Sequence, residues 1–204
     1  MKAVAKRRMQ VGFTLVEVLV AMVVMAIMAV MAWQGVDSIV RARDASEARL
    51  EQTLRLNTVV AQWERDLASV QTTGKVDALK CDGASVRMTR RVRDGIQVVV
   101  WSLRPDPSGN ALVRWAGPVA TTGEALQDSW LASLQLQGTE NGSVRALTGI
   151  STWQTPFWYK DTGMAHCQSS AGTGSKLIGV RLLLSFAGGN GVNGDLLRDV
   201  MVTP

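Results

Sequence analysis

A single carboxylate interrupts the most apolar stretch of this chain. Residues 13–33 read FTLVEVLVAMVVMAIMAVMAW, and Glu17 is the only ionisable residue among them. An unpaired carboxylate at the centre of a bilayer costs roughly 2.5 to 3.5 kcal/mol, and less near the end of a helix. The position therefore indicates a carboxylate that pairs with a cation. The alternative is a side chain close enough to the interface to reach water.

Cysteine and histidine, the other residues that could carry chemistry, are scarce. Cys81 and Cys167 are the two cysteines, and His166 is the single histidine. These counts exclude a cysteine-dense scaffold and a four-cysteine zinc site, and they remove most histidine-based sites. The adjacent His166 and Cys167 point apart in an extended chain, which argues against a nucleophile–base pair. We expect His166 to be a solvent-facing loop residue.

Four residues near the C-terminus are candidates for a calcium site, namely Asn190, Asn193, Asp195 and Asp199. Their spacing lacks the repeated acidic pattern of a calcium loop, and turn-forming residues explain it more simply. The sequence also contains no GxSxG, HExxH, P-loop or GxGxxG string. We therefore expect no enzymatic activity, no metal, no cofactor and no small-molecule substrate.

A helix over residues 13–33 would position Glu17, and it is long enough to cross the ~30 Å hydrocarbon layer of a membrane. The residues before it are basic, which predicts a cytoplasmic N-terminus and a body on the other side, periplasmic in a bacterium. The basic residues in question are Lys2, Lys6, Arg7 and Arg8. Removing these four from the 22 basic residues leaves 18 against 17 acidic ones. The balance argues against a nucleic-acid-binding face.

Three explanations compete for the first 33 residues. A secretory signal would not carry Glu17 inside its apolar stretch. A plain membrane anchor explains the length and the flanking charge, but not the string Gly12-Phe13-Thr14-Leu15-Val16-Glu17. That string resembles the type IV prepilin signature, in which a basic leader ends in Gly and is followed by Phe, Thr-Leu, an aliphatic residue and Glu.

The resemblance implies roles for three of these residues. A prepilin peptidase would cut after Gly12 and methylate the new terminal amine of Phe13. Glu17 would offer its carboxylate to the amine of Phe13 on a neighbouring subunit. Two charges that are costly alone in lipid are tolerated as a pair in a helical bundle.

The helical pattern continues beyond residue 33 as an amphipathic segment with charged residues on its remaining faces. We expect one helix to about residue 70. The chain then divides into a cleaved leader (1–12), a transmembrane half of the helix (13–35), an amphipathic half (36–72) and a periplasmic β-rich domain (73–204).

After residue 74 the sequence changes to short β-rich runs separated by Gly, Pro, Asn and Asp. We predict an α+β, pilin-like fold, with the long N-terminal helix packed on an antiparallel body that forms two sheets, or one sheet with a large insertion. A long loop is expected over 152–175. The predicted strands are 85–92, 95–104, 111–116, 131–137, 144–153, 179–187 and 196–203.

Two features of the body leave alternatives open. Trp130, Trp153, Phe157 and Trp158 form either an exposed partner patch or a second buried cluster under the long loop. The inferred topology places Cys81 and Cys167 in an oxidising compartment, which favours a disulfide between them over two separate thiols.

Two further segments narrow the family. Gln62-Trp63-Glu64-Arg65-Asp66-Leu67 and Ala111-Leu112-Val113-Arg114-Trp115 resemble stretches of J-type minor pseudopilins of type II secretion systems. That resemblance implies a non-enzymatic subunit of the inner membrane at the tip of a short periplasmic pseudopilus. Its implied partners are the I-type and K-type minor pseudopilins, the major pseudopilin and the prepilin peptidase. A W-type minor pilin that initiates type IV pili, or an unprocessed membrane-anchored periplasmic binding domain, are the alternatives.

Overall fold

The computed structural model describes residues 13–107, 109–167, 176–187 and 193–202. The chain divides into two compact units, Met1–Ala48 and Arg49–Pro204. Helix α1 (Leu15–Ala68) begins in the first unit and ends in the second. All strands and the second helix belong to the second unit, which is called the body below.

Helix α1 ends at Ala68, slightly before the residue expected from the sequence. The segment that follows turns into the sheet, where Val70 forms an isolated antiparallel bridge with Arg90. The backbone N–H of Gln71 donates to the carbonyl of Thr89 at 2.9 Å, and that of Arg91 donates to Ser69 at 2.8 Å. These hydrogen bonds take the place of further helical ones.

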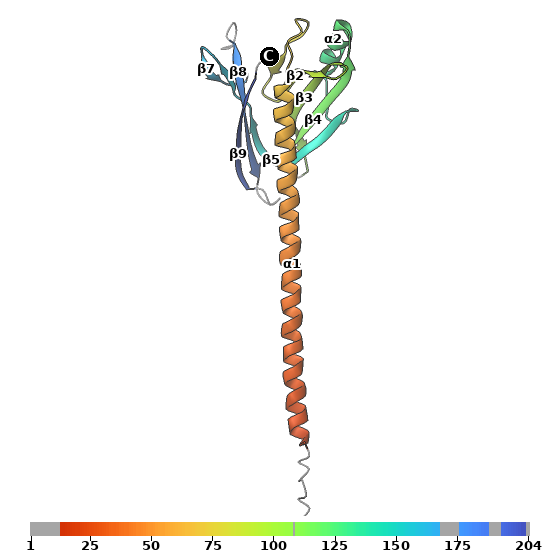
Figure 1. The fold of residues 1–204 in the computed structure, drawn as a ribbon, viewed down its shortest axis with the longest axis vertical. Coiled ribbons are helices and arrows are strands. Elements are labelled where there is room, and N and C mark those ends of the chain that lie inside the picture. Colours follow the sequence, from red (N-terminus) through yellow and green to blue (C-terminus); the bar gives the residue numbers. More distant parts are fainter. Residues whose placement is uncertain (1–12, 108, 168–175, 188–192, 203–204) are drawn as a thin grey trace, which may run out of the picture. The chain divides into compact units, whose positions relative to one another are not determined.

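The described part of the body contains one antiparallel sheet of nine strands (Figure 1). Its order is β1-β2-β3-β4-β5-β8-β6-β7, and β9 pairs with β8. The strands are β1 (Leu79–Cys81), β2 (Ser85–Val92), β3 (Gly95–Asp106), β4 (Gly109–Ala120), β5 (Ser143–Gln154), β6 (Phe157–Tyr159), β7 (Gly163–Ala165), β8 (Leu177–Ala187) and β9 (Asn193–Met201).

Of the two arrangements expected from the sequence, two sheets is wrong, because the described strands form a single sheet. Strands β4 and β5 remain paired across register shifts at Asn110/Leu112 and Leu112/Val113. Such irregularities bend a sheet without ending its ladder of hydrogen bonds. All nine strands can therefore belong to one continuous, bent sheet. The α+β class, with a long helix and an antiparallel body, is confirmed.

One predicted strand is also wrong. Residues 131–137 contain the end of helix α2 (Gly123–Ala132) and the turns after it. Thr122 caps the helix by accepting a hydrogen bond from the N–H of Ala125. Leu126 and Trp130, four residues apart on one face of the helix, are buried, so packing stabilises a helix that extends into the first two residues of the predicted strand.

The other six predicted strands coincide with β2, β3, β4, β5, β8 and β9. The expected loop over 152–175 instead contains the end of β5, β6 and β7, and its residues 168–175 lie outside the described part of the chain.

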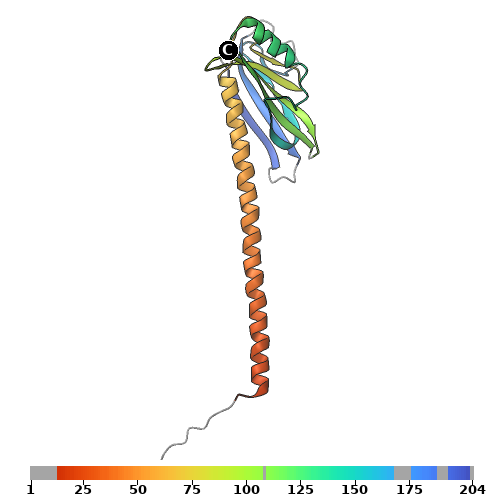
Figure 2. The ribbon, with the colours of Figure 1, turned by 90° about the vertical axis from the view of Figure 1, so that its right-hand side faces the viewer.

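Alternate residues of the sheet enter two hydrophobic clusters. Trp101 of β3 packs with Trp63 and Leu67 from the end of α1. Val100, its neighbour in sequence, packs with Trp130 of α2. Successive side chains of a strand point to opposite faces. The end of α1 and the short helix α2 therefore cover opposite faces of β3 (Figure 2).

Candidate functional site

The N-terminal end of α1 carries the residues that the sequence assigns to processing and assembly. Phe13 and Thr14 precede the helix, and Phe13 is exposed. The carboxylate of Glu17 accepts hydrogen bonds from the N–H of Thr14 at 3.0 Å and from its hydroxyl at 2.9 Å. The hydroxyl of Thr14 accepts in return from the N–H of Glu17 at 3.3 Å. Gly12 and the rest of the predicted leader lie outside the described residues.

This arrangement is a capping box, in which Thr at the N-cap and Glu three residues later satisfy each other's backbone donors. In the single chain, the Glu17 carboxylate is thus held by Thr14. Its pairing with the Phe13 amine of another subunit stays a prediction.

The helix that follows has the length and composition of a membrane anchor. Its most apolar 18-residue window has a mean hydropathy of 2.7, and none of that window is buried. Among the described residues, α1 is the one helix with these properties. The length and composition of α1 therefore suit a single membrane anchor.

The two segments singled out near residues 62–67 and 111–115 meet inside the body. Asp66 of α1 is fully buried. It accepts hydrogen bonds from Arg114 of β4 at 2.7 and 3.0 Å and from Arg90 of β2 at 2.8 Å. Trp101 of β3 and Gln62 complete the set, each at 2.9 Å. One buried carboxylate therefore ties α1 to three strands.

Sequence reasoning missed Arg90 and Trp101 as partners of Asp66. The residue that could have indicated these partners is Asp66 itself. It lies between Trp63 and Leu67 on the helix face that is otherwise apolar and buried. A buried carboxylate must be paired and hydrogen-bonded, so basic residues on the facing strands were to be expected. The strands do not carry a marker that distinguishes Arg90 from the exposed arginines near it in sequence.

The second arginine is held by its own partner. The guanidinium of Arg90 donates to the side-chain oxygen of Gln97 at 2.8 and 3.2 Å. The amide of Gln97 donates in turn to the carbonyl of Gly117 at 2.7 Å. The network around Asp66 thus continues across β2, β3 and β4, which makes it a structural junction between helix and sheet.

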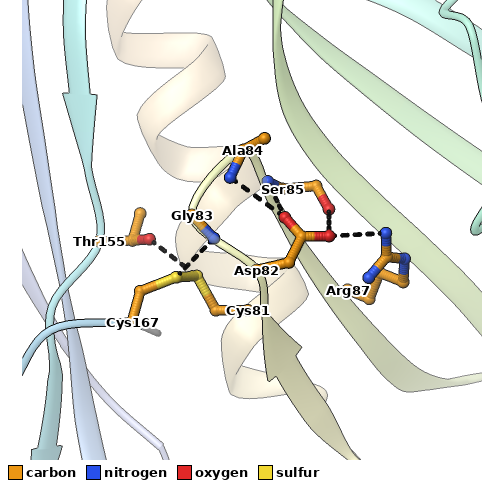
Figure 3. The surroundings of a disulfide bond; sticks show 8 residues. All are labelled: Cys81, Asp82, Gly83, Ala84, Ser85, Arg87, Thr155 and Cys167. Atoms are coloured by element: carbon orange, nitrogen blue, oxygen red, sulfur yellow. Dashed lines mark hydrogen bonds and ion pairs between the residues drawn. A yellow bond between two sulfur atoms is a disulfide. The ribbon is translucent and has the colours of Figure 1, made fainter. Parts of the chain in front are cut away.

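Cys81 and Cys167 form a disulfide in the structure, with their Cα atoms 5.4 Å apart (Figure 3). The N–H of Gly83 lies 3.1 Å from the sulfur of Cys167, and the hydroxyl of Thr155 lies 3.5 Å from that of Cys81. The bond joins the end of β1 to the segment after β7, with the β5–β6 connection beside it.

Asp82, next to the disulfide, is hydrogen-bonded on both carboxylate oxygens (Figure 3). Its partners are Ser85, through both N–H and hydroxyl, Ala84 and the guanidinium of Arg87 at 2.8 Å. Burial raises the pKa of Asp82, but the hydrogen bonds from Ser85 and the charge of Arg87 outweigh it. The pKa of Asp82 therefore lies below its ordinary value.

The four aromatic residues whose role was open do not form one exposed patch. Trp153 and Phe157 are buried in the cluster beneath α1, and Trp130 of α2 is buried against the opposite face of the sheet. Trp158 is 39% exposed, and the guanidinium of Arg181 lies 5.4 Å from the centre of its ring. Three of the four thus serve packing.

The remaining candidate residues are separated by the fold. His166 is exposed, and its neighbour Cys167 belongs to the disulfide. Asp199 pairs with Arg181 at 2.6 and 2.7 Å, and Asn190 lies outside the described residues. Within the described part of the chain, no three His, Cys, Asp or Glu residues group as metal ligands.

Comparison with protein families identifies the N-terminal segment. Residues 7–33 match the family model described as the prokaryotic N-terminal methylation motif. The motif supports a type IV prepilin-like protein. It spans the end of the basic leader, Gly12, Phe13, Glu17 and the apolar helix up to residue 33. No curated protein matches this chain significantly.

Proposed function

We propose that the chain is a minor pseudopilin of a type II protein secretion system. It assembles at the tip of a short periplasmic pseudopilus after a prepilin peptidase has cut between Gly12 and Phe13 and methylated the amine of Phe13. It is anchored in the inner membrane by α1, with its N-terminus in the cytoplasm and its body in the periplasm. It is a structural subunit and not an enzyme.

The observation that carries the proposal is the methylation motif at the start of an apolar helix that leads into a β-rich body. Cleavage on the cytoplasmic side would leave the apolar helix on the mature chain, so the product stays in the membrane until it is assembled. The basic residues before the cut favour this orientation.

The J-type assignment is supported by the two segments that resemble that group. Each supplies one member of the buried ion pair between Asp66 and Arg114, so both belong to the junction between α1 and the sheet. The partners proposed on this basis are the I-type and K-type minor pseudopilins and the major pseudopilin.

Processing is tested by mass spectrometry of the protein extracted from membranes. We expect N-methylated Phe13 as the first residue of the mature chain. An intact Met1, or a start near residue 33, would contradict the prepilin assignment and favour an unprocessed anchor or a secretory signal.

Membership of a secretion system is tested by deleting the gene and restoring it on a plasmid. We expect proteins to accumulate in the periplasm of the deletion strain and secretion to return on complementation. Normal secretion together with loss of surface pili would favour the minor pilin of a type IV pilus instead.

A further inference from the structure

Strand β9 forms a long open edge of the sheet. It pairs with β8 through nine consecutive residue pairs without a register shift, and no strand of the described chain pairs with its other side. The two ends of the strand order, β1 and β7, are only three residues long each. Natural proteins blunt such edges with charged side chains, above all Lys, or with Pro or a bulge. Strand β9 has no Lys, Pro or bulge, and its charged residues are Asp195, Arg198 and Asp199.

The backbone groups that are free to bind can be assigned. The N–H of Val202 donates to the carbonyl of Ile178 at 3.0 Å, continuing the ladder between β9 and β8. Backbone groups alternate in direction along a strand, so even-numbered residues of β9 bond to β8. The odd-numbered residues Asp195, Leu197, Asp199 and Met201 present their N–H and C=O groups outward.

The side chains of these same four residues lie on one face of the strand, because side chains also alternate. Leu197 is 52% exposed and Met201 is 74% exposed. Asp199 is paired with Arg181 of β8, whereas Asp195 has no ion-pair partner among the described residues. The edge thus presents an acidic residue at one end and apolar residues at the middle and the other end.

The opposite face of β9 is occupied within the body. Arg198 donates to the carboxylate of Glu64 on α1 at 2.5 Å, and Leu196 and Val200 pack against the main core. Helix α2 lies on the face of the sheet opposite the end of α1, where it packs on β3 and β4. The acidic and apolar face of β9 is therefore left uncovered by either helix.

A second copy of this chain is a poor occupant of the edge. In a two-fold pairing, β9 of one copy would lie antiparallel to β9 of the other, with the same face of each sheet on the same side. If the whole strand is used, the two copies of Leu197 lie opposite each other at the centre. That register puts Asp195 of one copy opposite Asp199 of the other. Because Asp199 is already paired with Arg181, this register gives Asp195 no cation and places it opposite another carboxylate, which disfavours the pairing.

We propose that the outer edge of β9 is a docking site for an extended strand of a different protein. The partner strand carries a basic residue opposite Asp195 and apolar residues opposite Leu197 and Met201. Its main chain pairs with the outward N–H and C=O groups of β9, as in strand addition to an open sheet edge. This surface is separate from the N-terminal segment on which the proposed function rests.

The test uses the full chain in the membranes of its own host. A photoreactive p-benzoylphenylalanine replaces Met201, and in a control protein it replaces Leu131, an exposed residue of α2. Peptide mass spectrometry identifies the residue to which each adduct is joined. We expect an adduct from position 201 but not from position 131. The adduct should join a different protein, within an extended segment that has a basic residue and apolar residues at alternate positions.

Further substitutions, added to the protein that carries the photoreactive residue at position 201, distinguish backbone pairing from side-chain contact. Leu197→Pro removes an outward N–H while leaving the ladder to β8 in place, and we expect it to lower the adduct yield by roughly tenfold or more. The matched Leu197→Val keeps the N–H and should leave the yield almost unchanged. Asp195→Lys reverses the charge at an exposed site and should lower the yield several-fold.

Three outcomes would overturn the proposal. These are an adduct with a second copy of the chain, equal adducts from positions 201 and 131, or a yield that Leu197→Pro and Asp195→Lys leave unchanged. Because Asp195 is exposed, Asp195→Lys remains informative even if Leu197→Pro does not fold.

Discussion

Asp66 shows how a single residue can fix the position of a helix on a sheet. Its carboxylate accepts hydrogen bonds from two guanidinium groups, an indole and an amide, and it is fully buried. Bringing these charges out of water is costly, so the pairing need not add net stability. Its effect is to allow one register of α1 against the strands.

Replacing Asp66 by Ala should destabilise the body strongly. The change leaves the largely buried guanidinium groups of Arg90 and Arg114 without their carboxylate, and the loss of one partner of a fully buried pair costs up to about 3 to 5 kcal/mol. Trp63 and Trp101, whose ring centres lie 5.6 Å apart, are close enough to the site to report unfolding by fluorescence. Urea titration of the full chain in detergent measures the loss.

The matched control is Asp199→Ala, which breaks the exposed pair with Arg181. Exposed ion pairs contribute about 1 kcal/mol or less, so this change should be mild. If the two variants unfold at the same urea concentration, Asp66 does not have the role assigned here.

Asp82 predicts a pH dependence of stability. Its pKa in the folded protein is below the ordinary value, so the folded state favours the charged carboxylate. The resulting stability is present above about pH 4, where the unfolded group is ionised, and is lost as pH falls through the folded pKa. Asp82→Asn should therefore lower the thermal midpoint at pH 7 and matter much less at pH 3. A difference from wild type that is equal at both pH values would contradict this account.

Among the elements, long periodic segments could be predicted from the sequence and short ones could not. The apolar run and the charged helix after it identify α1, and alternation identifies the six longest strands. Strands β1, β6 and β7 have three residues each, too few for a pattern to emerge. Their pairing depends on neighbours that are distant in sequence.

Helix α2 was missed for a different reason. Leu134 and Leu136 alternate as on a half-buried strand, yet Thr122 caps a helix that begins before them and buries Leu126 and Trp130. Tertiary packing decided between two local patterns. The partners of Asp66 could not be predicted for a similar reason. The order of the strands, which brings Arg90 and Arg114 together, does not follow from the sequence around either arginine.

The disulfide gives a prediction at the scale of elements. Its cysteines are 86 residues apart, and the chain-entropy model gives up to about 4.5 kcal/mol for closing a loop of that length. Adding a reductant should lower the urea midpoint of the oxidised protein clearly, and Cys81→Ser with Cys167→Ser should reproduce the effect. Unfolded, periplasm-derived protein in which both cysteines react with an alkylating reagent before reduction would show that the bridge does not form.

At the scale of the whole molecule, Glu17 separates membrane insertion from assembly. Glu17→Ala removes a charge from the apolar segment, so insertion should survive. Cleavage should largely survive too, because Gly12 and the basic residues before it are unchanged. If the carboxylate pairs with the Phe13 amine of a neighbouring subunit, its loss leaves that amine unpaired in a low-dielectric setting. We expect normal abundance in the membrane, with reduced co-purification of other minor pseudopilins and reduced secretion.

Thr14→Val is the informative control for this variant. It removes the capping hydroxyl, at a typical cost of about 1 kcal/mol to the helix, but it keeps the carboxylate of Glu17. Secretion should therefore fall far less than with Glu17→Ala. Equal defects would assign the role of Glu17 to capping, and wild-type secretion by Glu17→Ala would mean that the body alone places the subunit.

The bond between Cys81 and Cys167 also determines what a protease can release. Every peptide bond between these residues lies within a closed covalent ring that includes β2 to β7 and α2. A single cut in that ring leaves the α1 end and the C-terminal end joined, so the nicked chain migrates as one species without reductant and as two fragments with it. A cut in α1 or between β8 and β9 separates the products at once. Gel patterns with and without reductant therefore show whether a protease cut between Cys81 and Cys167 or outside that segment.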